Sequence, residues 1–123
     1  MNPGRLLTLP GLLERAAASD CGLRFLESKG GVTEHLYADL WRDAQALCAV
    51  LEDRLHKGDR AGLIFSTSYD FVRALFAVSM TGAMPFCLAP LRLGRGSDYS
   101  ETTAGMIRRA GAKLVLCEES ILR

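Results

Sequence analysis

The sequence contains no segment suited to crossing or entering a membrane. Its uninterrupted apolar runs fall well short of the roughly 18 residues that a bilayer-spanning helix needs. Residues 1–7 include one arginine but neither the apolar core nor the small-residue cleavage site of a secretory signal peptide. We therefore expect a cytoplasmic protein with no membrane span and with reduced thiols.

Patterns for metal and nucleic-acid binding are equally scarce. The four cysteines lie 27, 39 and 30 residues apart, without a CxxC pair, and only two histidines accompany them. These spacings do not fit a structural zinc site, whose ligands come in closely spaced pairs. Fifteen Lys and Arg against fourteen Asp and Glu leave a net charge of +1. Bulk charge therefore predicts no attraction to nucleic acid.

Glycine-rich phosphate loops are also missing. The chain has no Gly-Lys-Ser/Thr sequence, which a P-loop requires. Gly94 and Gly96 begin a pattern like a dinucleotide fingerprint, but Tyr99 stands where its third glycine belongs, and Asp98 would repel a phosphate. We interpret the arginine-containing segment 92–98 as an exposed loop.

What is present fits one globular domain over residues 1–123. Hydrophobic residues make up 49% of the chain and charged residues 24%, which is typical of a soluble domain with a true core. The pattern divides it into residues 1–58, predicted to form a short helix, a hairpin and a long helix, and residues 59–117, predicted to form a β-α-β-α-β unit.

The N-terminal part begins with a helix expected at about residues 10–18, followed by hairpin strands at 23–27 and 32–36. A long amphipathic helix comes next. Its apolar stripe recurs at intervals of three or four residues and consists of Leu40, Ala44, Leu47, Leu51 and Leu55. Two aspartates lie near its start, basic residues 54, 56 and 57 near its end, and Gly58 is expected to close it.

In the second part, short apolar runs alternate with helical patterns. Strands are predicted at residues 61–65, 84–88 and 113–117, and helices at about 69–81 and 98–110. Right-handed crossovers make this a parallel sheet with helices on its faces, so the fold class is α/β with a partial three-layer sheet. If the strand at 113–117 is an edge, it is apolar and unprotected, and it invites another segment or chain to cover it.

The turn Ser66-Thr67-Ser68 is the candidate ligand-binding site. It follows a predicted strand and opens a predicted helix, where hydroxyls and free backbone N–H groups can hold an anion. The alternative is that Ser68 only caps the helix, which is the commoner role for a serine in that position.

Catalytic groups are thinly represented. Cys87 and Cys117 fall in strands predicted to be buried and Cys48 on a helix, where inert core thiols are the usual case. Glu118 and Glu119 are interpreted as a solvated pair rather than as a general acid and base. The helical-spaced apolar residues are interpreted as core, namely Phe71, Leu75, Phe76 and Met80.

Several segments taken together resemble the N-terminal portion of adenylate-forming enzymes, the superfamily of acyl-CoA synthetases and nonribosomal adenylation domains. Residues 36–40, Leu-Tyr-Ala-Asp-Leu, resemble the first core motif without its hydroxyl residue, which weakens a helix cap. Residues 58–60 and 68–72 resemble its Gly-Asp-Arg-Val and Ser-x-x-Phe-Val passage. Residues 77–85 resemble the second core motif, and residues 90–95 with the Ala-Gly-Ala at 110–112 look most like the fatty-acyl-AMP ligase branch.

This resemblance implies a parent enzyme that uses ATP and Mg²⁺ to activate a fatty acid as acyl-adenylate for transfer to an acyl carrier protein. The family's phosphate loop, its adenine and ribose contacts and its catalytic lysine have no counterpart in these 123 residues. The resemblance therefore implies no catalytic residue, metal ligand or cofactor site here. We expect an inactive scaffold whose partner is the remainder of the ligase or another chain at the sheet edge.

Two alternatives remain open. The chain could be a truncated, non-catalytic relative that binds or assembles through its open sheet edge. It could also be an independent flavodoxin-like nucleotide-binding domain, although the missing glycine-rich loop counts against that hypothesis. The acyl substrate, the choice between carrier protein and coenzyme A, and the oligomeric state do not follow from the sequence.

Overall fold

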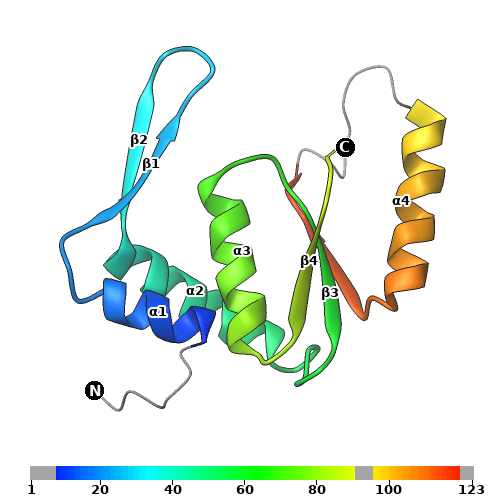
Figure 1. Ribbon diagram of the computed structural model, residues 1–123, viewed down its shortest axis with the longest axis horizontal. Helices are drawn as coiled ribbons and strands as arrows, with labels where there is room; N and C mark the ends of the chain where they lie inside the picture. The colour runs from blue at the N-terminus through cyan, green and yellow to red at the C-terminus, as the bar shows by residue number, and fades with distance from the viewer. Residues whose placement is uncertain (1–7, 91–95, 120–123) are drawn as a thin grey trace.

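The structure is a computed structural model that describes residues 8–90 and 96–119, with an α/β arrangement of a hairpin, a parallel sheet and helices (Figure 1). In chain order the elements are α1 (Leu9–Ala16), β1 (Gly22–Leu26), β2 (Val32–Leu36), α2 (Tyr37–Leu51), β3 (Arg60–Ile64), α3 (Tyr69–Met80), β4 (Met84–Leu88), α4 (Gly96–Ala110) and β5 (Leu114–Cys117). The α/β fold class and every element expected from the sequence are confirmed. Most element boundaries lie within two residues of the expected ones.

The parallel sheet has the strand order β4-β3-β5. Ala61 pairs with Pro85 on one side and with Leu114 on the other, and both pairings are parallel. The crossover from β3 through α3 leads to β4 at one edge of the sheet, and the crossover from β4 through α4 leads back to β5 at the other edge. Because both crossovers are right-handed and run in opposite directions across the sheet, the two helices lie on opposite faces. Figure 1 shows this, with α2 and α3 on one side of the sheet and α4 on the other.

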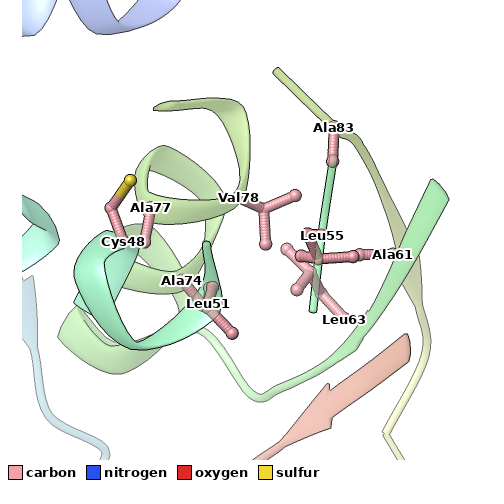
Figure 2. Close-up of a cluster of buried hydrophobic side chains, with 9 residues drawn as sticks. All are labelled: Cys48, Leu51, Leu55, Ala61, Leu63, Ala74, Ala77, Val78 and Ala83. Atoms are coloured by element: carbon pink, nitrogen blue, oxygen red, sulfur yellow. The ribbon is translucent and has the colours of Figure 1, made fainter. Parts of the chain in front are cut away.

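The main core lies between the sheet and the pair α2 and α3 (Figure 2). Ala61 and Leu63 point to this face of β3 and are fully buried. Leu51 and Leu55 come from the end of α2 and the turn after it, and Val78 comes from α3. Leu55 therefore belongs to the apolar stripe as expected.

Helix α2 ends earlier than the sequence pattern indicates. It stops at Leu51, and a turn in which Leu51 accepts hydrogen bonds from the backbone N–H groups of Arg54 and Leu55 carries the chain to Gly58. The basic residues expected in its last turn therefore lie beyond the helix, and Gly58, with φ of 88°, closes that turn. At the other end, Leu36 forms no side-chain cap, as the missing hydroxyl predicted.

The opposite face of the sheet is covered by α4 alone within the described residues. The Phe86 ring lies across Gly62, where an added Cβ would come within 3.1 Å of it. Helix α4 is tied down at its two ends, where Tyr99 Oη donates to the Ala89 carbonyl (2.7 Å) and Arg60 Nη1 donates to the Ala110 carbonyl (2.8 Å).

Strand β4 is an edge strand, which explains two details. Pro85 lacks the N–H that a central strand would need, so the edge accommodates it. Cys87 is exposed, so the expectation of a buried thiol at this position is wrong: its register partner Leu63, in the central strand, is fully buried, whereas an edge strand has neighbours on one side only. Cys48 is buried as expected and Cys117 is half-buried.

The hairpin β1–β2 projects from the body of the molecule, above α1 and α2 in Figure 1. Its apolar residues at the tip remain largely in solvent, with Leu26 exposed by 84% and Val32 by 53%. Near its base, the Tyr37 amide donates to the Cys21 carbonyl at 3.0 Å. No helix in the described parts of the chain combines the length and apolar character needed to span a bilayer.

Candidate functional site

The carboxyl ends of β3 and β4 lie side by side at the point where the connections of the two strands diverge. From these neighbouring ends one connection turns to α3 on one face and the other leads to α4 on the opposite face. In open parallel sheets such a point of divergence is where ligands usually bind. The predicted turn Ser66-Thr67-Ser68 lies at this point, between β3 and α3.

Ser68 is the N-cap of α3. Its Oγ accepts a hydrogen bond from the Phe71 amide at 3.2 Å and donates to the Ser66 carbonyl at 3.2 Å. The capping role that the sequence allowed for Ser68 is therefore confirmed. Ligand binding by Ser66, Thr67 and Ser68 stays a prediction.

Ser66 is held by a carboxylate from the end of β5. The Ser66 amide donates to Glu118 Oε1 at 2.8 Å, and Ser66 Oγ donates to Glu118 Oε2 at 3.2 Å. The Glu118 carboxylate thus lies where an anion would meet this end of the turn, so a ligand anion would have to displace it. The interpretation of Glu118 as a solvated residue is wrong, because the β3–β5 pairing brings it to Ser66 across 52 positions of sequence.

A cleft of about 390 Å³ separates the hairpin from this turn. Its hairpin wall includes Phe25, Thr33 and His35, and its opposite wall includes the Ser66–Ser68 turn and Tyr69. Hydroxyl, imidazole and carboxylate groups line most of the cleft, the carboxylates coming from Glu27 and Asp70, so it suits a polar ligand better than an apolar one.

The floor of this cleft is built from a connected set of side chains. The rings of His35 and Tyr69 stack with centroids 3.9 Å apart. Tyr69 Oη donates to Asp43 Oδ2 at 2.5 Å. This hydrogen bond holds the pKa of the Asp43 carboxyl below its usual value, while burial, followed by the Asp43 hydrogen bond, raises the pKa of Tyr69. At neutral pH Tyr69 is therefore a neutral phenol and Asp43 an ionised carboxylate.

A second cleft, of about 360 Å³, lies between β4 and α4. Leu88, Tyr99 and Met106 give it a mainly apolar wall, and Thr102 and Thr103 add two hydroxyls. The prediction of an exposed loop at residues 92–98 is wrong for residues 96–98, which form the first turn of α4, and residues 92–95 lie outside the described residues.

Two further observations on the described parts of the chain concern a reactive thiol and a metal site. Burial, and after it the nearby Glu52 carboxylate, raises the pKa of the Cys48 thiol, which opposes thiolate formation. No group of three His, Cys, Asp or Glu side chains within the described ranges is placed to hold a metal ion.

The sequence as a whole matches a model of one protein family. That family is described as AMP-binding enzyme, and the match runs from residue 13 to residue 122. It therefore includes the Ser66–Ser68 turn, the hairpin and all three strands of the parallel sheet.

Curated relatives point the same way. A Caulobacter vibrioides protein named as an acyl-CoA synthetase is 33% identical over 112 residues, which cover 89% of this chain and 20% of that protein. A Mycobacterium tuberculosis protein named as the fatty-acid–CoA ligase fadD25 is 29% identical over 122 residues, covering 94% and 20%. The chain spans about one fifth of the length of these relatives.

Solved structures share its fold. One, from a study of fatty acyl-adenylate ligases of E. coli and L. pneumophila, is 29% identical with a TM-score of 0.84, covering 94% of this chain and 21% of that one. The adenylation domain of a keto acid-selecting NRPS module is 23% identical with a TM-score of 0.82, covering 95% and 22%. The second likeness concerns the fold alone.

Proposed function

The chain belongs to the family of AMP-binding enzymes, and we propose that it is the N-terminal scaffold portion of a cytoplasmic fatty-acyl-AMP ligase-like enzyme. The complete enzyme would convert a fatty acid and ATP into acyl-adenylate and pyrophosphate, and would pass the acyl group to an acyl carrier protein. The observation that carries this proposal is the 29% identity and TM-score of 0.84 to a fatty acyl-adenylate ligase structure over 94% of the chain.

In this proposal the 123 residues position other parts of the enzyme and perform no chemical step. The described residues offer no metal-holding group, and Glu118 already satisfies the Ser66 donors. In this proposal Mg²⁺ and ATP are bound by the remainder of the enzyme, and no catalytic role is assigned to these residues. We expect the isolated chain to be inactive.

The open edge of β5 supports a scaffold role. Residues 114–117 are all apolar and half-buried, and β5 pairs only with β3 within the described residues. An unprotected parallel edge of this kind favours a further strand. In the proposed enzyme the remainder of the ligase pairs there.

The same edge supports a second candidate function. A non-catalytic relative of the ligases would use β5 to bind a partner chain or a second copy. The two candidates differ in the mass of the natural gene product. Capture of that product from its host, followed by intact-mass measurement, should give a value several times 13.4 kDa for the ligase. A native product of 13.4 kDa would favour the assembly module.

Activity is best tested by a chimera. This chain would replace the matching N-terminal fifth of the fatty acyl-adenylate ligase to which it is 29% identical. We expect fatty-acid-dependent ATP–pyrophosphate exchange in the chimera and none in the isolated chain. A chimera carrying Leu63→Glu, which places a charge in the core, is the matched control and should lose exchange. A folded chimera without exchange would contradict the scaffold proposal.

A further inference from the structure

Positive charge gathers at the amino ends of the parallel strands. Lys57 and Arg60 come from the approach to β3 and its first residue, Arg108 and Arg109 from the last turn of α4, and Lys113 from the approach to β5. All five are exposed. We call these five residues the basic edge.

Two hydrogen bonds bring Arg60, the end of α4 and Lys113 together. Arg60 Nη1 donates to the Ala110 carbonyl at 2.8 Å, directly after Arg108 and Arg109 in the chain. The Lys113 amide donates to the Arg60 carbonyl at 2.8 Å. In Figure 1 the lower ends of β3 and α4 and the start of β5 lie at the same end of the molecule.

The five cations of the basic edge outnumber the one carboxylate that adjoins any of them in the sequence, Asp59. Within the described ranges none of the five forms an ion pair, and Asp59 accepts from the His56 amide at 2.9 Å and pairs with its ring. Asp98, near the start of α4, and Glu118, directly after β5, lie at the other end of the sheet. The basic edge is therefore a local excess of positive charge in a chain whose net charge is only +1.

An apolar notch opens beside these cations. It measures about 270 Å³ and is lined by Arg60, Met84, Pro85, Phe86 and Ala110. Met84 is 48% exposed although it begins a strand, directly opposite Arg60 in the β3–β4 register. A half-exposed methionine next to a guanidinium that forms no ion pair within the described residues is typical of a docking surface rather than of a solvated face.

We propose that the basic edge and its notch bind an acidic partner protein, which inserts an apolar side chain between its carboxylates. Charge complementarity supplies the attraction and the orientation, and the notch supplies the specificity. A protruding apolar side chain of a protein fits this concave notch. The phosphates of nucleic acid and the headgroups of a bilayer present no such side chain. This inference goes beyond the proposed scaffold role and does not depend on it.

The test measures binding of a short helical peptide, rich in glutamate with one central leucine, to the 123-residue chain by fluorescence anisotropy. We expect binding that weakens as salt is raised. Arg108→Ser with Arg109→Ser should weaken it about tenfold, since each lost surface ion pair contributes up to about 1 kcal/mol. Lys57→Ser with Lys113→Ser removes the same charge without altering α4 and should act alike.

Matched controls separate local from global charge. Arg24→Ser with Lys29→Ser removes two cations from the hairpin and should leave affinity within about twofold. Met84→Ser should weaken binding without changing its salt dependence. Equal effects of the hairpin and edge variants, no peptide binding, or stronger binding to phosphatidylglycerol vesicles or a DNA duplex would each overturn the proposal. These outcomes leave the chimera experiment unaffected.

Discussion

The imidazole of His35 lies flat against the phenol ring of Tyr69, with 3.9 Å between the centroids and 14° between the planes. Phe25 meets the same imidazole edge-on, with centroids 5.9 Å apart, and Asp43 holds the Tyr69 hydroxyl from α2. These four side chains join the hairpin to α2 and α3. The hairpin's orientation therefore depends on a few contacts at its base.

The Tyr69 hydroxyl should contribute to stability at neutral pH. Tyr69→Phe keeps the stack but removes the hydrogen bond to Asp43, and we expect a loss of about 1 kcal/mol in the free energy of unfolding. Because the folded pKa of Tyr69 lies above its ordinary value of 10.0, the advantage of the natural protein is complete below pH 10 and declines as pH rises above it. Urea unfolding at neutral and alkaline pH measures both. An advantage that persists unchanged at high pH would contradict this assignment.

Asp43 should govern part of the acid sensitivity. Its folded pKa is lowered, chiefly by the Tyr69 hydrogen bond, so its stabilising effect is present above its ordinary value of 3.8 and is lost as pH falls through the lower folded value. Asp43→Asn should be less stable than the natural protein at neutral pH and should approach it below about pH 4. Asp53→Asn, at an exposed position after α2, is the control. In urea unfolding it should change the free energy of unfolding neither at neutral pH nor below about pH 4.

Gly22 should be irreplaceable at the start of the hairpin. A Cβ on Gly22 would overlap the His35 carbonyl oxygen and come within 2.8 Å of the Leu36 Cα, both of which are backbone atoms. Gly22→Ala should therefore separate β1 from β2 at this end and speed amide exchange throughout the hairpin. Gly31→Ala, whose Cβ would meet only Glu27 side-chain carbons at 3.9 Å, is the matched control. Similar exchange rates in the two variants would show that the strands can shift to make room.

The Glu118 carboxylate should order the β3–α3 turn. Glu118→Ala removes both acceptors of Ser66, and we expect about fivefold faster exchange of the Ser66 amide, equivalent to about 1 kcal/mol. Glu118→Gln keeps one oxygen and should lie between. Glu101→Gln, on the exposed side of α4, should have no effect on that amide. Unchanged exchange of the Ser66 amide in Glu118→Ala would contradict this role for Glu118.

The core of the sheet should be sensitive to truncation. Leu63 is fully buried between β3 and the α2–α3 layer, so Leu63→Ala should cost about 3 kcal/mol in unfolding free energy through lost burial and an added cavity. Leu26 is 84% exposed at the hairpin tip, and Leu26→Ala should change stability by less than about 0.5 kcal/mol. Chemical denaturation of the two variants distinguishes these positions directly.

The sequence predicted the helices and strands because apolar spacing and capping involve residues that are close together in the chain. The spacing of apolar residues located α2, and the hydroxyl of Ser68 located the start of α3. The sequence could not predict the strand order, and two errors follow from that: Cys87 was expected to be buried and Glu118 to be solvated. The first depends on which strand forms the edge of the sheet, and the second on which strands lie side by side so that their carboxyl ends meet.

Other features were missed because they join distant residues through packing. Neither His35 nor Asp43 shows by its neighbours in sequence that Tyr69 connects them. The end of α2 was placed too late because Leu55 continues the apolar stripe into a turn that is no longer α-helical. A buried leucine reports packing, not helix length.

The strand order also determines the sequence in which this chain can fold as it is synthesised. Strand β3 lies at the centre of the sheet, yet its second neighbour, β5, is made about fifty residues after it and after α3, β4 and α4. Until β5 leaves the ribosome, one side of β3 carries unpaired backbone groups beside an incomplete apolar layer. Truncations that end before residue 114 should therefore aggregate more readily than those that include residues 114–117.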